Sequence, residues 1–397
     1  MNIPFLDLKR QYEQLKNELE PIAVEVLRSG AYIGGKYVQT FEEQMREYLG
    51  AKYVIGCANG TDAIMLALRA CDIQPGDEVI TTPFTFFATA EAIAAIGAVP
   101  VFVDVKESDF NIDPGKIESK ITSRTKAIMP VHIFGWPCDM EQINQIAKKH
   151  GLHVIEDAAQ AIGSTYGGAY NKKIGDTNNL VTFSFYPTKN LGACGDAGMI
   201  STNDDRLALI ARSFREHGMA KDGAKAREYL TGEKDDFAME NNPDALYNPY
   251  KYYNYLIAYN SRLDALQAAI LGVKLKYLSD YTKKRASIAA RYNAGLNGIV
   301  TVPQPPAAGT SCFHQYVIRT DKKDELSAFL AGKGISTGAF YPVPLHLQKA
   351  FTYLGYKTGD LPTAEMLSTQ TVCLPIFPEL YDEEVEAVIK AVKEYFI

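Results

Sequence analysis

Two hydrophobic patterns alternate along the first half of the chain. Short runs of apolar and β-branched residues, which predict strands, lie at 52–57, 77–82, 100–105, 127–133, 153–157, 180–185 and 198–202. Apolar residues recur every three or four positions at 13–29, 61–71, 88–97, 139–151 and 204–214, and this spacing predicts helices. Many strand runs are apolar on both faces, as strands between two helical layers must be. The pattern therefore predicts an α/β fold with a mostly parallel sheet, whose ligands bind at the carboxyl ends of the strands.

The alternation stops at 218–258, a polar segment rich in tyrosine. A structureless loop of this length is uncommon inside a compact domain, so we interpret it as a functional excursion or a partner contact. A long helical pattern follows at 262–296, then a strand at 314–320 and helices at 323–333 and 382–395. We expect a large domain over 12–260 and a small α+β domain over 261–397, which residues 1–11 are predicted to join.

Composition and charge exclude several classes of protein. Of the 397 residues 47% are hydrophobic and 22% charged, as in a soluble globular protein. The net charge of −6 argues against non-specific nucleic-acid binding. Six scattered cysteines, without a CxxC pair, indicate reduced thiols rather than disulfides or a metal site. No signal peptide is recognisable, and no apolar run reaches the ~20 residues of a membrane helix. We expect a cytoplasmic protein with neither a nucleic-acid nor a membrane partner.

Lys189 follows directly on a predicted buried strand, in the stretch 182-TFSFYPTKNLGACGDAG-198. A solvated surface charge is the plainest explanation of a lysine. A P-loop lysine needs GxxxxGK[ST], which the chain lacks. A third explanation is a lysine that forms a Schiff base with pyridoxal 5'-phosphate (PLP). Such a site also needs a carboxylate for the pyridine nitrogen, N–H groups at a helix start for the phosphate, and a flat apolar surface for the ring.

Three other predicted strand ends offer these groups. Asp157 ends the strand 153–157, although it could equally be a helix N-cap. Gly60 and Thr61 open a predicted helix, where a tight turn is the alternative. Phe86 lies in the aromatic stretch after 77–82, where a core position is the alternative. Each signal is weak alone, but their occurrence at successive strand ends favours the PLP hypothesis.

The sequence resembles the DegT/StrS family of PLP-dependent sugar aminotransferases from end to end. The resemblance rests on the stretches FLDLKRQYE, SGAYIGG, ANGTDA, DEVITTPFTFFAT, VIEDAAQ, SFYPTKNLGACGDAG, YNSRLDALQAAIL and FYPVPLHLQ. It implies the three-layer PLP-transferase fold of type I, with a mostly parallel central sheet and a smaller C-terminal α+β domain.

The resemblance also implies roles for individual residues. Lys189 matches the Schiff-base lysine, and Asp157 matches the partner of the pyridinium nitrogen. The other implied cofactor contacts are Gln160 at the phenolic oxygen, Ser184, Gly60 and Thr61 at the phosphate, Phe86 stacked on the ring, and Asn260 reaching the phosphate from the other subunit. A homodimer with shared active sites would follow.

For the substrate, the resemblance implies L-glutamate as amino donor and a keto sugar as acceptor. The stretch SGAYIGG is similar to the branch that acts on 3-keto sugars linked to UDP or dTDP, which supplies amino sugars for surface polysaccharides or glycosides. Candidate substrate contacts are Tyr32, Arg262, His314, Tyr316, Tyr341 and His346. An ion pair at a helix start is the alternative for Arg262, and a structural role is the alternative for the tyrosines and histidines.

Other functions stay open at this point. The acceptor could be a 4-keto nucleotide sugar or a keto-inositol. A sugar dehydratase of this family would carry histidine in place of Lys189. A regulatory protein on an inactive PLP fold would have lost the lysine, aspartate or serine. A dinucleotide-binding dehydrogenase would need GxGxxG after the first strand, where this chain has ANGTDA.

Overall fold

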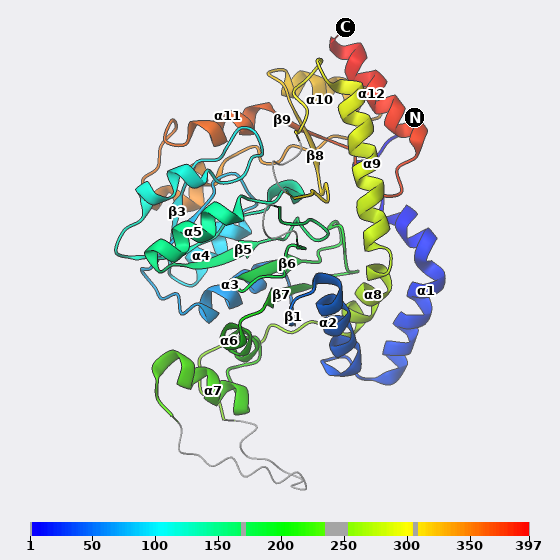
Figure 1. The fold of residues 1–397 in the computed structure, drawn as a ribbon. Coiled ribbons are helices and arrows are strands. Elements are labelled where there is room, and N and C mark those ends of the chain that lie inside the picture. Colours follow the sequence, from blue (N-terminus) through cyan, green and yellow to red (C-terminus); the bar gives the residue numbers. More distant parts are fainter. Residues whose placement is uncertain (1, 168–171, 235–252, 305–308, 397) are drawn as a thin grey trace.

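The structure, a computed structural model, describes residues 2–167, 172–234, 253–304 and 309–396 (Figure 1). The helices are α1 (Leu8–Ser29), α2 (Gly35–Leu49), α3 (Gly60–Ala70), α4 (Ala88–Ala95), α5 (Met140–His150), α6 (Asp205–Arg215), α7 (Ala220–Thr231), α8 (Ala265–Leu275), α9 (Leu278–Leu296), α10 (Lys323–Gly332), α11 (Pro362–Gln370) and α12 (Asp382–Phe396). The strands are β1 (Tyr53–Cys57), β2 (Glu78–Thr81), β3 (Val99–Phe102), β4 (Thr125–Ile128), β5 (His153–Asp157), β6 (Leu180–Ser184), β7 (Gly198–Thr202), β8 (Tyr316–Arg319) and β9 (Thr371–Leu374).

The central sheet is mostly parallel, as predicted. Within the described residues it has seven strands in the order β1-β7-β6-β5-β4-β2-β3. The pairs β2–β3, β2–β4, β4–β5 and β5–β6 are parallel, whereas β7 runs antiparallel to both β1 and β6. The parallel strands therefore bring their carboxyl ends to one edge of the sheet, where β5 delivers Asp157 and β6 delivers Ser184.

Helices cover both faces of this sheet. Successive strand residues point to opposite sides, so that Ile80 and Val181 pack with α2, α5 and α8, whereas Val79 and Leu180 pack with α3 and α6. The strands are apolar on both faces because both faces are covered. The predicted three-layer architecture is confirmed.

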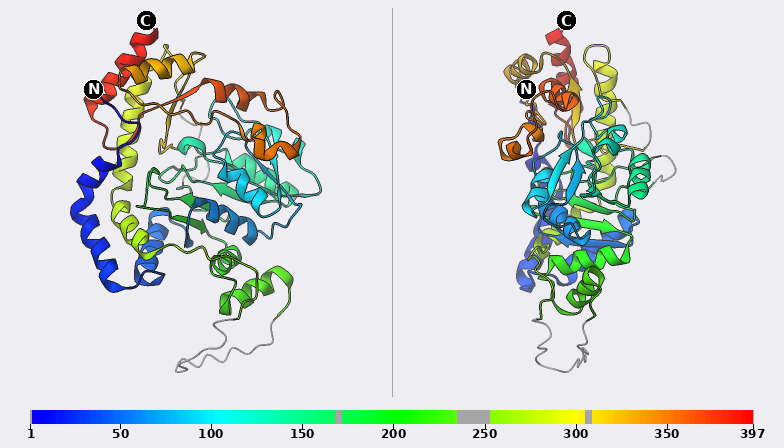
Figure 2. Two further views of the ribbon diagram at one scale, coloured as in Figure 1. Left: turned by 180° about the vertical axis from the view of Figure 1, so that it is seen from behind. Right: turned by 90° about the vertical axis from the view of Figure 1, so that its left-hand side faces the viewer.

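The C-terminal part has a core of its own. Strands β8 and β9 form an antiparallel pair, and α9, α10 and α12 pack against it. Ile3 is buried in the same core, and both termini lie at this end of the molecule (Figures 1 and 2). Helix α9 runs from the side of the large sheet up to this core. The domain limits 12–260 and 261–397 stay a proposal.

Two segments differ from the sequence-based expectation. The helical pattern at 262–296 forms two helices, α8 and α9, because the chain turns at Lys276–Tyr277, where both side chains bond to Glu18 of α1. The excursion 218–258 contains α7, which packs on α6 and projects from the body of the molecule (Figure 1). Its residues 235–252 lie outside the described residues.

None of the helices in the described part of the chain is long and apolar enough to cross a membrane.

Candidate active site

A cavity of about 470 Å³ opens at the carboxyl edge of the sheet. The loops after β1, β2 and β4 and the ends of β5 and β6 supply most of its lining, and residues next to β8 and at 340–341 close it from the C-terminal part. Of the residues predicted for the cofactor, the cavity brings together Lys189, Asp157, Gln160, Ser184, Gly60, Thr61 and Phe86.

Asp157 lies at the end of β5 and is 5% exposed. Its Oδ2 accepts a hydrogen bond from the Thr89 hydroxyl at 2.7 Å, and its Oδ1 accepts one from the Ala159 N–H at 3.1 Å. The neighbouring Glu156 points to the other side of the strand, where His132, Tyr166 and Asn179 hold its carboxylate. Both faces of the strand end are therefore fixed by hydrogen bonds, and the carboxylate of Asp157 is turned toward the cavity.

Lys189 lies in the loop that joins β6 to β7. Burial lowers the pKa of its amine to about 8, and the charge of Asp157 only partly opposes this effect. Backbone hydrogen bonds from Phe185 to Ala197 and from Ala193 to Phe185 close the loop at its base, and the Lys189 N–H bonds to the carbonyl of Tyr186. The loop thus presents an amine that is substantially neutral near pH 8, as a nucleophile or a base must be.

The start of α3 forms an anion-binding cradle against the end of β6. Asn59 is the N-cap and accepts the N–H of Asp62, while the N–H groups of Gly60 and Thr61 have no acceptor within the helix. A Cβ at Gly60 would come within 2.7 Å of the Ser184 Cβ, so only glycine lets the helix start approach Ser184 this closely. A phosphate group fits this cradle.

Two further cofactor candidates in the cavity, Phe86 and Gln160, both lie next to Tyr341. Phe86 is 58% exposed, with its ring 6.3 Å from that of Tyr341. Gln160 accepts the Phe134 N–H at 2.7 Å and donates to the Tyr341 hydroxyl at 2.8 Å. Burial raises the pKa of Tyr341, so this hydroxyl stays protonated and can donate its own hydrogen into the cavity.

His314 enters the cavity from the C-terminal part. Its Nδ1 lies 3.1 Å from the Asn190 Oδ1, and the Asn190 amide nitrogen donates to the carbonyl of Cys312. Asn190 must therefore accept from His314, which places the imidazole hydrogen on Nδ1 and leaves Nε2 as an acceptor. Burial, together with the charges of Lys189 and Arg285, holds the pKa of His314 well below its usual value.

Two predicted substrate contacts do not line the cavity. Tyr316 lies in the core of the C-terminal part, where its hydroxyl donates to Asn293 and its ring packs on Tyr292. His346 is buried with its Nε2 3.0 Å from Glu365. Within one chain, Tyr316 and His346 therefore have a structural role, which was the alternative to a contact with the substrate.

Three other predicted residues, Tyr32, Asn260 and Arg262, do not line this chain's cavity. Tyr32 is 50% exposed, and its carbonyl accepts the N–H of Ala265, which joins the segment 31–34 to the segment that carries Asn260 and Arg262. Asn260 is exposed, and Arg262 lies 3.8 Å from Glu216, with which it forms an ion pair.

Several residues of the cavity were missed from the sequence. They are Asn59, Thr85, Thr89, Tyr186, Asp196 and Gln315, which line it, and Asn190, which holds His314. Tyr186 and Asp196 lie within the stretch 182–198 that identified Lys189. Their position in that stretch is the signal from which they could have been predicted.

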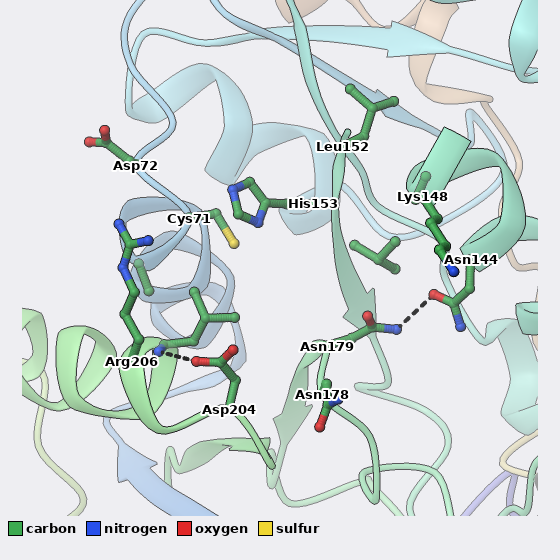
Figure 3. Close-up of a pocket in the computed structure, with 14 residues that line it drawn as sticks. Cys71, Asp72, Asn144, Lys148, Leu152, His153, Asn178, Asn179, Asp204 and Arg206 are labelled. Atoms are coloured by element: carbon green, nitrogen blue, oxygen red, sulfur yellow. Dashed lines mark hydrogen bonds between the residues drawn. The ribbon is translucent and has the colours of Figure 1, made fainter. Parts of the chain in front are cut away.

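A second cavity, of about 380 Å³, lies at the amino end of β5, the opposite end of that strand from Asp157. Figure 3 shows its walls, in which Asn144 and Asn179 are joined by a hydrogen bond and which also carry the cations Lys148 and Arg206 and the carboxylates of Asp72 and Asp204. None of the predicted site residues lines it.

Comparisons with known proteins identify similarity to one family over almost the whole chain. The profile of the DegT/DnrJ/EryC1/StrS aminotransferase family matches residues 13–393. A "Pleiotropic regulatory protein" of Geobacillus stearothermophilus is 48% identical over 100% of this chain and 99% of its own. The dTDP-3-amino-3,6-dideoxy-alpha-D-galactopyranose transaminase of Aneurinibacillus thermoaerophilus is 43% identical over 99% of both chains. The crystal structure of S. venezuelae DesV in complex with a ketimine intermediate superposes with a TM-score of 0.89, at 37% identity over 99% of this chain and 98% of that one.

Proposed function

The chain belongs to the DegT/DnrJ/EryC1/StrS aminotransferase family, and from this premise we propose that it moves an amino group from L-glutamate to the C3 keto group of a hexose linked to UDP or dTDP. The product would be a 3-amino sugar for a surface polysaccharide or a glycoside. The observation that carries this proposal is the buried amine of Lys189 beside the carboxylate of Asp157 in the large cavity.

The enzyme is a PLP-dependent aminotransferase, and the cavity fits this cofactor. Gly60, Thr61 and Ser184 would hold the phosphate, Asp157 would hold the ring nitrogen, and Phe86 would cover the ring. When bound, PLP supplies an electron sink that allows the C–H bond next to the donor's amino group to break.

Lys189 moves the proton in this proposal. Its Nζ would be freed from the cofactor when the amino donor binds, would take the proton from the Cα of the donor, and would deliver that proton to the cofactor carbon that carries the transferred nitrogen. The pKa of about 8 suits this task, because an amine that is partly neutral near physiological pH can both accept and release a proton.

Asp157 and its neighbours supply the electrostatics. Its carboxylate stabilises positive charge on the heterocycle throughout the reaction, and two hydrogen bonds hold it in place without further reorganisation. Gln160 and Tyr341 present polar hydrogens at the wall of the cavity toward the cofactor's phenolic oxygen.

The position of the keto group is supported by the sequence and by one relative. The stretch SGAYIGG is similar to the 3-keto branch, and the enzyme of A. thermoaerophilus at 43% identity is named for a 3-amino sugar. His314 and Tyr341 lie in the cavity and are our candidates for contacts with the sugar. A 4-keto nucleotide sugar is the alternative acceptor.

A second copy of the chain would complete the site. Tyr32, Asn260 and Arg262 do not line the cavity of their own chain, and both Tyr32 and Asn260 are exposed. Leu27 and Ile33, 56% and 54% exposed, lie beside Tyr32. We propose that this surface packs against a partner in a homodimer, so that Asn260 reaches the partner's phosphate cradle.

The acceptor can be tested directly. The holoenzyme is treated with L-glutamate until its visible spectrum changes, and 3-keto and 4-keto sugars linked to UDP or dTDP are then added separately. We expect only a 3-keto sugar to restore the starting spectrum and to yield an amino sugar by mass spectrometry. Restoration by 4-keto sugars alone would overturn the assignment of C3.

A regulatory role is the second candidate, because the relative at 48% identity is named a regulatory protein. The intact Lys189, Asp157 and Ser184 favour catalysis. A Lys189→Ala protein that still turned over the substrates would contradict the proposed mechanism. A wild-type protein that binds PLP but aminates no acceptor would favour regulation.

A further inference from the structure

Two buried threonines connect the aromatic wall of the cavity to Asp157. Thr89, in the first turn of α4, and Thr85, just before that helix, are 1% and 2% exposed, and both line the cavity. Their hydroxyl oxygens lie 3.1 Å apart, and the Thr89 hydroxyl lies 2.7 Å from the Asp157 Oδ2. Thr89 is 68 positions away from Asp157 in the sequence.

The direction of these hydrogen bonds follows from the chemistry of the groups. An ionised carboxylate only accepts, so the Thr89 hydrogen must point to Asp157. The Thr89 oxygen then accepts, so the Thr85 hydrogen must point to Thr89. The hydroxyl hydrogens of Thr85 and Thr89 therefore both point along the row toward the Asp157 carboxylate, and the hydrogen bond from Thr89 fixes the orientation of that carboxylate.

We propose that Thr89 is a positioning residue, whose hydroxyl holds the Asp157 carboxylate turned toward the cofactor's ring nitrogen, with Thr85 orienting that hydroxyl. This inference rests on the proposed function, because it assumes that Asp157 pairs with the ring.

The same segment carries Phe86, between the two threonines in the sequence. The start of α4 therefore sets both the surface over the ring and the orientation of the group that pairs with its nitrogen. The Thr89 hydroxyl makes its hydrogen bonds to Asp157 and Thr85. Its effect must pass through the carboxylate.

Four variants test the proposal. Thr89→Val removes the hydroxyl and keeps the branched shape, Thr89→Ser keeps the hydroxyl, and Thr85→Val removes the outer donor. Thr81→Val is the matched control, since Thr81 is also buried but donates to the carbonyl of Met129. Each apoprotein is titrated with PLP, the visible spectrum of the bound cofactor is recorded from pH 6 to 9, and kcat and KM are measured.

We expect Thr89→Val to lower kcat by about tenfold to a hundredfold with little change in the KM for glutamate, as for a lost hydrogen bond to a charged group. Its PLP spectrum should also shift in its pH dependence. Thr89→Ser should restore both, Thr85→Val should show a smaller effect in the same direction, and Thr81→Val should match the wild type.

A folded Thr89→Val protein with unchanged spectrum and kcat would overturn the proposal. So would a Thr89→Ser protein as impaired as Thr89→Val, because the methyl group would then be responsible. Asp157→Asn separates this failure from that of the proposed function. If Asp157→Asn changes the spectrum and Thr89→Val does not, only the role of Thr89 fails, whereas two unchanged spectra would overturn the role of Asp157.

Discussion

The amine of Lys189 is buried, and in the protein without cofactor this burial lowers the free energy of unfolding. The charged amine is favourable in the unfolded chain and unfavourable in the cavity, which is why its pKa falls from 10.5 to about 8. The unfolded state therefore binds more protons than the folded state, and the cost is fully present below about pH 8. It disappears as the pH rises through 10.5.

Replacing this amine should stabilise the apoprotein. We expect Lys189→Met to raise the free energy of unfolding at pH 7 by about 1–3 kcal/mol and to abolish transamination. The gain should shrink between pH 8 and pH 10, as urea unfolding at a series of pH values would show. Lys120→Met, a change at an exposed lysine, is the control. An equal gain at pH 7 and pH 10 would mean that burial of charge is not the cause.

Among single residues, the sequence reveals site groups that are unusual in their position, and it misses site groups of a type that occurs throughout any chain. Lys189 and Asp157 were recognisable because a charged residue at the end of a buried strand needs an explanation. Thr89 and Asn190 were not, because a hydroxyl or an amide is ordinary anywhere, and its partner is distant in the sequence. Tyr316 and His346 show the converse, since their residue types suggested a site and their burial gives them structural partners.

Among the elements, the contact between α3 and β6 decides how the phosphate is held. Gly60 begins the helix, and a methyl group there would meet the Ser184 side chain, at 2.7 Å from Cβ and 3.2 Å from Oγ. The helix start would have to move away from the strand end. Its N–H groups and the serine hydroxyl would then no longer converge on one anion.

Gly60→Ala should therefore weaken cofactor binding more than it weakens the fold. We expect the dissociation constant for PLP to rise by about tenfold or more, as for the loss of one hydrogen bond to a charged group. Equilibrium titration of the apoprotein measures it. Gly332→Ala, at the end of α10 with nothing within 4 Å, should leave the constant unchanged. A Gly60→Ala protein with wild-type affinity for PLP would show that the Ser184 side chain can move aside without weakening phosphate binding.

Strands were easier to predict than helices in this chain. The strands of the sheet are apolar on both faces, and short apolar runs between helical segments are distinctive. Helix α2 was missed although Tyr37, Phe41 and Met45 follow helical spacing. The break between α8 and α9 has no glycine or proline to mark it, and the side chains at the break, Lys276 and Tyr277, bond to Glu18 of α1.

At the scale of the whole molecule, the surface with Tyr32, Asn260 and Arg262 predicts that active sites need two chains. A chain with Lys189→Ala lacks the amine of its own site but could lend Asn260 to its partner. A chain with Asn260→Ala has the opposite defect. Each protein alone is expected to be nearly inactive, because every site in either homodimer lacks one of the two groups.

Mixing the two variants should restore activity. Random exchange of subunits makes about half of the dimers mixed, each with one intact site of two, so we expect about a quarter of wild-type activity. Lys189→Ala mixed with Asp157→Ala is the control and should restore nothing, because both residues belong to the same chain's cavity. No recovery in the first mixture would contradict a shared site. Sequence patterns alone cannot place such a surface, because the two chains meet only after folding.

The closed loop between β6 and β7 has a consequence for the speed of turnover. In every catalytic cycle of the proposed mechanism, Lys189 must release the cofactor and later bond to it again at the same position. Since backbone hydrogen bonds join Phe185 to Ala197 and Ala193 to Phe185, the main chain keeps its shape while the side chain swings. Rotation about side-chain bonds takes picoseconds to nanoseconds, whereas a loop that had to rearrange would take nanoseconds to microseconds. The lysine can therefore be recaptured without the additional rearrangement that an open loop would need.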